Sequence, residues 1–338
     1  MIFISARVHP GEVPGSHIMK GLLDFLTPGK TSIYAKNSVN ADPNAMDPRA
    51  MALLNHFVIK IVPMLNPDGV ARGHYRFDTL GQNLNRHYDE PDWQRQPAIY
   101  AVKEVIKQIE VEYGDYTKRK VPMVQSGKRR DYPVPGQLYL YMDLHAHAGK
   151  RGAFIYGNHF EDIEDQAQAM LYPRLISANT LNFDFGECNF TEKLMLKKDK
   201  KGVSREGAGR VAMHRECPGL VHSYTLEANY CCGGKLNALS ERFDLEKRRF
   251  LAEIEPVTDA SSTLYAPYPR HKQDQSPMDT FVYQARYSSA IFSDIGRACM
   301  VAVLDLIYQN PQPRVQSVQQ LKGELLYRIM EDRENATS

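Results

Sequence analysis

The sequence predicts an α/β domain in which a mixed, mostly parallel β-sheet is flanked by helices. Short apolar runs alternate with longer segments in which apolar residues recur every three or four positions. The short runs are nearly continuous in apolar residues, as is typical of parallel strands covered on both faces. They stop at histidine, glutamate, asparagine or aspartate residues. Because open α/β sheets bind ligands at the carboxyl ends of their strands, this edge is the expected functional site.

The expected elements follow from these two periods. Four strands are expected, over residues 1–8, 56–65, 137–144 and 219–226. Helices are expected after Gly15 and Ser16, and over residues 96–112, 279–308 and 315–329. Loops are expected over residues 27–48, 114–136 and 193–210, and the last two are rich in lysine and arginine. We expect one domain over residues 1–308, followed at 309–338 by an amphipathic helix and a polar tail.

Composition excludes several classes of protein. The 338 residues carry 42 Lys+Arg and 40 Asp+Glu, a net charge of +2, which argues against a dedicated nucleic-acid binder. No apolar run reaches the roughly 18–20 residues of a membrane span, and the first residues lack a secretory signal. Five scattered cysteines suit reduced thiols. We therefore expect a soluble cytoplasmic protein without nucleic-acid or membrane partners.

Two strand ends carry candidate metal ligands. His9 and Glu12 flank a Pro-Gly turn after the first strand, and His145 follows the third. Two imidazoles and a carboxylate suit a catalytic zinc ion, because they leave a fourth position open. Asp143 lies on the same side of its strand as His145 and could orient the imidazole. Taken alone, each group is equally compatible with a surface or capping role.

Further candidates lie beyond the other strand ends. Glu227 could take a proton from an activated water and pass it to a leaving amine, although an isolated glutamate is more often an ion-pair partner. Arg76 and Arg86 lie in two polar segments after the second strand. Arginine binds carboxylates in a planar two-bond geometry. A solvated loop is the other interpretation of such segments.

Five ordered motifs resemble the M14-type zinc metallocarboxypeptidases, in the variants of the cytosolic carboxypeptidase subfamily. They are His9-Pro-Gly-Glu12, Asn66-Pro-Asp-Gly69, Gly81-Gln-Asn-Leu-Asn85-Arg86, Asp143-Leu-His145 and Thr225-Leu-Glu227. The likeness extends from residue 1 to about residue 305. That subfamily trims glutamates from tubulin and other acidic C-termini. The resemblance therefore implies a zinc carboxypeptidase fold and a cytosolic deglutamylase, associated with microtubules or cilia, whose partners are polyglutamylated tubulin or similar tails.

The resemblance also implies a role for each matching residue. His9, Glu12 and His145 match the ligands of a single Zn²⁺, and Glu227 matches the general base. Arg76 matches the arginine that stabilises the oxyanion. Asn85 and Arg86 match the pair that binds the terminal carboxylate, and Arg210 matches the basic residue that selects glutamate. The two basic loops could steer an acidic tail toward the site.

The sequence departs from the subfamily at its start, and two other functions and one further metal site are also compatible with it. The subfamily carries a β-sandwich domain and further strands before the His-Pro-Gly-Glu turn, and we expect this chain to lack them. A zinc acylase of the aspartoacylase or succinylglutamate desuccinylase type uses a related ligand set. A truncated, non-catalytic tubulin-binding form is the possibility outside enzymes. A separate zinc site of His214, Cys217, His222 and Cys231 is conceivable, but the spacing matches no standard finger.

Overall fold

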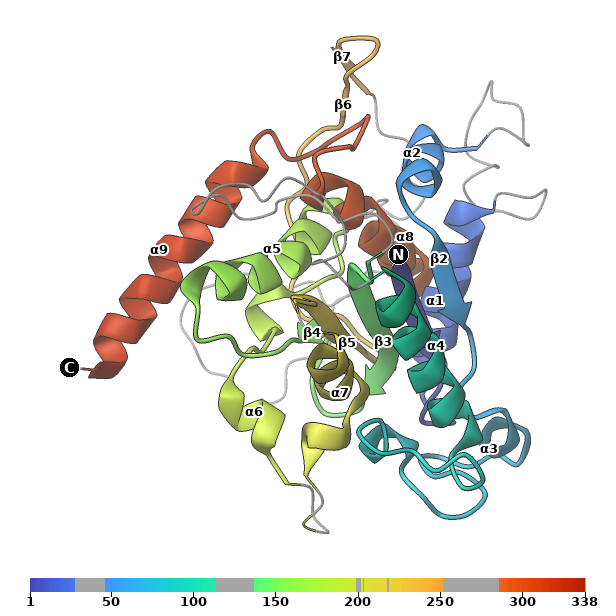
Figure 1. The fold of residues 1–338 in the computed structure, drawn as a ribbon. Coiled ribbons are helices and arrows are strands. Elements are labelled where there is room, and N and C mark those ends of the chain that lie inside the picture. The colour runs from blue at the N-terminus through green and yellow to red at the C-terminus, as the bar shows by residue number, and fades with distance from the viewer. Residues whose placement is uncertain are drawn as a thin grey trace, which may run out of the picture.

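The computed structural model contains a five-stranded sheet in the order β2-β1-β3-β5-β4 (Figure 1). It describes residues 1–27, 46–113, 137–198, 202, 204–217, 219–251 and 286–337. The strands are β1 (Ile2–Ala6), β2 (Ile59–Val62), β3 (Leu140–His147), β4 (Ala153–Tyr156) and β5 (His222–Asn229). The first three and β5 pair in parallel, and β4 pairs antiparallel to β5. The expected mixed, mostly parallel sheet is therefore confirmed.

The strand register brings candidate site residues together. Ser5 of β1 lies opposite Asp143 of β3, and His145 of β3 lies opposite Glu227 of β5. Because these strands run in the same direction, their carboxyl ends form one edge of the sheet. Residues that are far apart in the sequence thus become neighbours.

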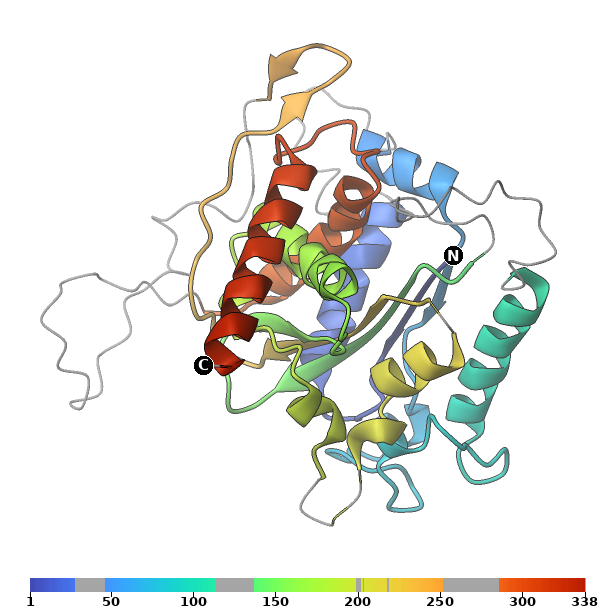
Figure 2. The same ribbon diagram turned by 60° about the vertical axis from the view of Figure 1, so that its left-hand side comes forward.

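Helices cover both faces of the sheet (Figures 1 and 2). Alternate strand residues point to opposite faces, so Ile2 and Ile4 belong to one apolar core and Phe3 to the other. The first core includes α1 (Val13–Leu26), α2 (Pro48–His56), α5 (Ile163–Asn179), α8 (Ser289–Leu306) and α9 (Val318–Thr337). The second includes α4 (Pro97–Tyr113) and α7 (Gly209–Glu216).

The remaining elements are short. They are α3 (Pro67–Ala71), α6 (Glu192–Leu196), the 3₁₀ turns Leu84–Arg86, Phe185–Glu187 and Arg205–Gly207, and a hairpin of β6 (Phe243–Asp244) and β7 (Arg249–Phe250). In the described part of the chain, no helix combines the length and apolar character that crossing a bilayer requires. The α9 helix packs on α5 through the shared core, and the domain boundary at residue 308 stays a prediction.

Several element bounds differ from those expected. β3 and β5 end at His147 and Asn229, three residues later than predicted, because their backbone pairing continues through the polar residues. The expected loop 193–210 was wrong: it contains most of α6, a 3₁₀ turn and the start of α7. The Ser204 side chain accepts a hydrogen bond from the Glu206 amide and caps that turn, a local contact hidden among lysines.

Other differences concern where elements begin and end, and elements that the sequence did not predict. The strand expected over 56–65 is limited to β2, and the helix expected over 279–308 begins at Ser289, where the Ser288 side chain accepts from the Ile291 amide. α2, α5 and β4 were not anticipated. The expected loop 114–136, most of the expected loop 27–48 and the first seven residues of the 279–308 helix lie outside the described residues.

Candidate metal centre and active site

The turn from β1 into α1 positions His9 and Glu12. Arg7, at its start, has φ +59°, a left-handed conformation that costs free energy outside glycine. Its guanidinium donates to the Pro10 carbonyl from Nε at 2.9 Å and to Ser16 Oγ at 2.7 Å. A Cβ at Gly11 would lie 2.7 Å from the Tyr75 carbonyl oxygen, which accepts from the Gly11 amide. Only glycine therefore permits this close approach.

His9, Glu12 and His145 converge at the strand ends. The His9 Nδ1 lies 2.7 Å from Glu12 Oε1, and the His145 Nδ1 lies 2.8 Å from Glu12 Oε2. All three side chains are buried, and one possible ligand atom from each lies within 4.8 Å of the others. Among the described residues, no other group of three His, Cys, Asp or Glu meets this distance. Nitrogen, nitrogen and carboxylate oxygen at this spacing fit a zinc ion.

Outer hydrogen bonds orient both imidazoles. The His145 Nε2 lies 2.7 Å from Asp143 Oδ2, and the other carboxylate oxygen accepts from Ser5 Oγ at 2.8 Å. The His9 Nε2 lies 2.9 Å from Asn83 Oδ1. Each ring thus binds a partner through Nε2, which leaves Nδ1 facing Glu12. Metal-binding histidines are usually held in this way, by a hydrogen bond from the ring nitrogen that does not bind the metal. The sequence predicts a role for Asp143, whereas it predicts none for Asn83, although Asn83 lies within the Gly81–Arg86 motif.

The Glu12 carboxylate and the two imidazoles shift one another's pKa values. Burial alone would raise the pKa of Glu12, but His145 and His9 lower it strongly. Burial alone would lower the pKa of His145, but Asp143 and Glu12 raise it. The two imidazoles therefore favour the ionised form of Glu12. A divalent cation would also favour that form.

Glu227 is in the opposite situation. It lies opposite His145 in the sheet register, and its Oε2 is buried and has no hydrogen-bond partner among the described residues. Burial raises the pKa of Glu227 to about 8, while His145 opposes the shift. A carboxyl group with a raised pKa near neutrality is suited to accepting and returning a proton.

One cavity of about 320 Å³ is lined by all eight predicted site residues. They are His9, Glu12, Arg76, Asn85, Arg86, His145, Arg210 and Glu227. Arg76 Nη1 lies 3.6 Å from Glu12 Oε1. The Asn85 side chain accepts from the Gly209 amide at 2.9 Å, which joins the Leu84–Arg86 turn to the start of α7. The structure thus gathers into one cavity groups from segments that are distant in the sequence.

Other residues of this cavity were not assigned from the sequence. They are Tyr75, Ala146, His147, Ala148, Gly149, Tyr156, Arg205, Ala208 and Thr225. His147 accepts from the Lys150 amide through Nδ1, and Lys150 pairs with Glu187 at 2.8 Å. Neither Lys150 nor Arg151 lines the cavity, so Arg205 is the additional cation there.

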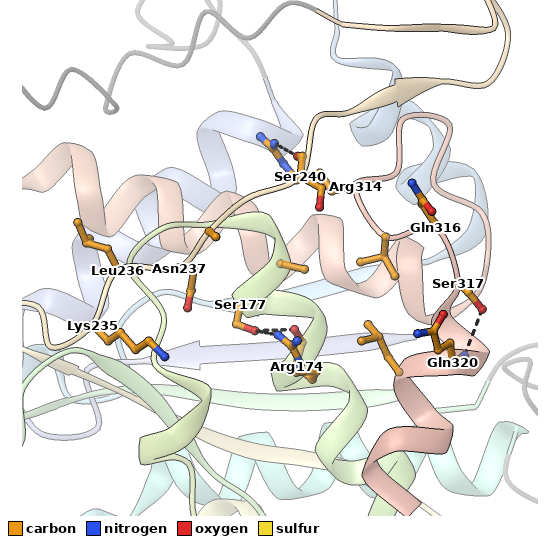
Figure 3. A pocket seen from close by; sticks show the side chains of 14 residues that line it. Arg174, Ser177, Lys235, Leu236, Asn237, Ser240, Arg314, Gln316, Ser317 and Gln320 are labelled. Atoms are coloured by element: carbon orange, nitrogen blue, oxygen red, sulfur yellow. Dashed lines mark hydrogen bonds between the residues drawn. The ribbon is translucent and has the colours of Figure 1, made fainter.

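Larger cavities lie elsewhere. One of about 540 Å³ lies between the end of α5, the segment 235–240 and the start of α9, and Figure 3 shows Arg174, Lys235 and Gln320 around it. A neighbouring one of about 390 Å³ adjoins the β6–β7 hairpin. Neither contains a predicted site residue. The volume of a cavity therefore does not identify the predicted active site in this structure.

Comparison with known proteins agrees with the geometry. The zinc carboxypeptidase family profile matches residues 1–202. The chain is 34% identical to human cytosolic carboxypeptidase-like protein 5, over 93% of this chain and 38% of that protein. It is 32% identical to mouse cytosolic carboxypeptidase 6, over 71% of this chain and 36% of that protein. The chain thus spans less than half the length of these relatives.

Solved structures share the fold. A metallo-carboxypeptidase from Burkholderia cenocepacia matches 91% of this chain and 57% of its own, with a TM-score of 0.54 and 18% identity. A metallo-carboxypeptidase from Pseudomonas aeruginosa matches 90% of this chain and 57% of its own, with a TM-score of 0.52 and 17% identity. With the family profile covering more than half of the residues, the chain belongs to the zinc carboxypeptidase family.

Proposed function

We propose that this chain carries the catalytic site of a zinc-dependent carboxypeptidase that removes terminal or side-chain-branched glutamates from acidic protein tails. The observation that supports it most directly is the His9–Glu12–His145 cluster, which shares a cavity with Glu227, whose Oε2 atom is buried. Besides these four residues and His147, the titratable side chains at the cavity include four arginines: Arg76, Arg86, Arg205 and Arg210. A site of this kind suits an anionic peptide end.

In this proposal His9, Glu12 and His145 hold one zinc ion, which when bound supplies a Lewis acid that polarises a carbonyl and lowers the pKa of a water molecule. Glu227 accepts the proton of the attacking water and returns it to the leaving amine. Because burial raises the pKa of Glu227, its ionised form is a stronger base than an ordinary carboxylate. Asp143 and Asn83 keep the two imidazoles in place.

Arginines bind the substrate's charges. Arg76 is partly exposed and close to Glu12, so its guanidinium can reach the oxygen of the scissile carbonyl as negative charge develops there. Asn85 and Arg86 bind the terminal carboxylate. Arg210 is 4% exposed and its Nη2 forms no hydrogen bond with the described residues, so it can bind an acidic side chain of the terminal residue. A C-terminal glutamate carries both groups, the terminal carboxylate and the side-chain carboxylate.

The partners we propose are glutamylated tubulin and similar acidic tails in the cytosol. The relatives named cytosolic carboxypeptidases and the arginine-rich cavity support this choice. The basic residues of segments 114–136 and 193–210 could add long-range attraction for such tails. That steering would appear as an association rate that falls as salt is added.

The decisive experiment compares the chain with Glu227→Gln on glutamylated tubulin, followed by mass spectrometry. We expect the chain to remove glutamates and the variant to lose about 10²–10⁴-fold in turnover, because the amide cannot accept the proton. Zinc content, measured by elemental analysis, should stay near one per chain in both. If the variant keeps a tenth or more of the turnover, another residue is the base.

A comparison of substrates separates the carboxypeptidase from a zinc acylase and from a non-catalytic tubulin-binding protein. Hydrolysis of N-acyl amino acids without cleavage of acidic peptides would favour the acylase. Zinc and tubulin binding without any turnover would favour the binding protein. Either result would overturn the proposed function.

A further inference from the structure

We propose that Arg205 is a second specificity residue, which together with Arg210 binds the side-chain carboxylate of a terminal glutamate. The inference rests on the proposed function and names the residues that select its substrate. Three properties of the two arginines support it: their position, the absence of an ion pair with any described residue, and their like charge.

Arg205 is held at the cavity by local structure. It begins the Arg205–Gly207 turn, and its amide donates to the Lys197 carbonyl at 3.2 Å. A Cβ at Gly207 would lie 2.3 Å from the Arg86 carbonyl oxygen, so this turn packs directly on the segment that carries Asn85 and Arg86. Arg205 and Arg210 therefore line the same cavity as the proposed terminal-carboxylate pair.

Neither guanidinium forms an ion pair within the described part of the chain, although the charge of Glu227 acts on Arg210 from a longer distance. The buried atoms Arg205 Nε and Arg210 Nη2 have no hydrogen-bond partner there. Nearby Glu206 is engaged by Arg215 at 2.6 Å and by Ser204 at 2.9 Å. Since buried charges are normally paired, a counter-charge from a ligand is the simplest completion of the buried Arg210, and the half-buried Arg205 can bind the same ligand.

The two guanidiniums carry the same charge, so the pair requires a negatively charged ligand. Burial, followed by the charge of Arg205, lowers the pKa of Arg210 to about 10, while Glu227 opposes the shift, so the Arg210 guanidinium stays ionised at neutral pH. A carboxylate with two oxygens can accept from two guanidiniums at once, whereas a carboxamide carries no balancing charge. Glutamine, which has the same shape as glutamate, should therefore be rejected by the pair.

The test compares kcat/KM for peptides that end in Glu and in Gln. The Glu/Gln ratio should fall at least tenfold in Arg205→Met and in Arg210→Met, and less in Arg205→Lys, which keeps the charge. The double variant should lose less than the product of the two single losses, because both arginines bind one group. Arg151→Met is the control: this residue is exposed and outside the cavity, so the ratio should not change.

Binding separates this inference from the proposed function. Calorimetry with L-glutamate and L-glutamine measures the same preference without turnover. A chain that cleaves neither peptide but binds glutamate preferentially, with that preference reduced at least tenfold in Arg205→Met, would refute the proposed function and support the role of Arg205. An unchanged ratio in Arg205→Met, with zinc content equal to the parent, would overturn the inference.

Discussion

Glu12 and Glu227 show how one cavity shifts the pKa values of two identical side chains in opposite directions. Flanking imidazoles lower the pKa of Glu12, whereas burial raises that of Glu227 to about 8. Their environments separate the two roles: a permanently ionised carboxylate suits a metal ligand, and a titratable one suits a proton carrier. This division is set by neighbours and not by residue type.

At the residue scale we also predict how Asp143 affects zinc binding. Asp143→Asn should weaken zinc binding by about 10–100-fold, because the amide keeps the shape but removes the charge that raises the basicity of the His145 ring. Competition with a chelator of known affinity measures the change.

His147→Ala is the matched control for Asp143→Asn. His147 is two residues from His145, but its Nδ1 accepts from the Gly149 and Lys150 amides. This variant should retain the parent's zinc affinity. Equal affinities in Asp143→Asn and the parent would contradict an orienting role for Asp143.

At the scale of elements, close helix packing fixes the scaffold behind the site. A Cβ at Gly296 of α8 would lie 2.1 Å from the Ile18 carbonyl oxygen of α1, and one at Gly21 would lie 2.1 Å from the Ser293 carbonyl oxygen. The backbones of α1 and α8 therefore touch at glycines. Because α1 begins directly after Glu12, this contact also fixes the position of a proposed ligand.

Gly296→Ala should destabilise the fold by about 1–3 kcal/mol, since the added methyl group overpacks the α1–α8 contact. Gly323→Ala is the control, because that glycine is in α9 and a Cβ there meets nothing within 4 Å. It should stabilise the fold by about 0.5–1 kcal/mol through helix propensity. Urea denaturation measures both. Equal effects of the two substitutions would show that α1 and α8 can move apart freely.

For the molecule as a whole, a buried histidine should limit stability in acid. Burial lowers the pKa of His222, which is 3% exposed among the rings of Tyr139, Tyr172 and Tyr224, to about 3. Because this is below the unfolded value of about 6.5, its stabilising contribution is present above pH 6.5 and is lost as pH falls toward 3. About 2 kcal/mol of it should be lost between pH 7 and pH 5.

His222→Asn should remove this part of the acid dependence, because asparagine can bind the Tyr224 hydroxyl without titrating. Burial raises the pKa of Asp305 to about 6, and that group changes stability in the opposite direction over part of the range. The comparison of variant and parent by urea denaturation at pH 7 and pH 5 isolates the histidine. The same loss in both proteins would contradict the prediction.

The sequence by itself determined the fold class and the edge of the sheet at which the candidate site residues meet. Alternation of apolar runs and helical periods predicted the parallel sheet, and the ordered motifs around His9, His145 and Glu227 located the site at its strand ends. These inferences succeed because strand period and turn chemistry are local properties. Residues close in sequence share them regardless of what the rest of the chain does.

Only the tertiary structure decided which groups meet. Asn83 binds His9 across 74 positions, and Arg205 joins Arg210 in the cavity although it was one of seven basic residues in a stretch expected to be a loop. Such contacts depend on strand register and on the packing of short turns, which no local pattern encodes. Burial also depends on the whole fold, so the unpaired guanidinium nitrogens of Arg205 and Arg210 and the raised pKa of Glu227 become visible only when the chain is folded.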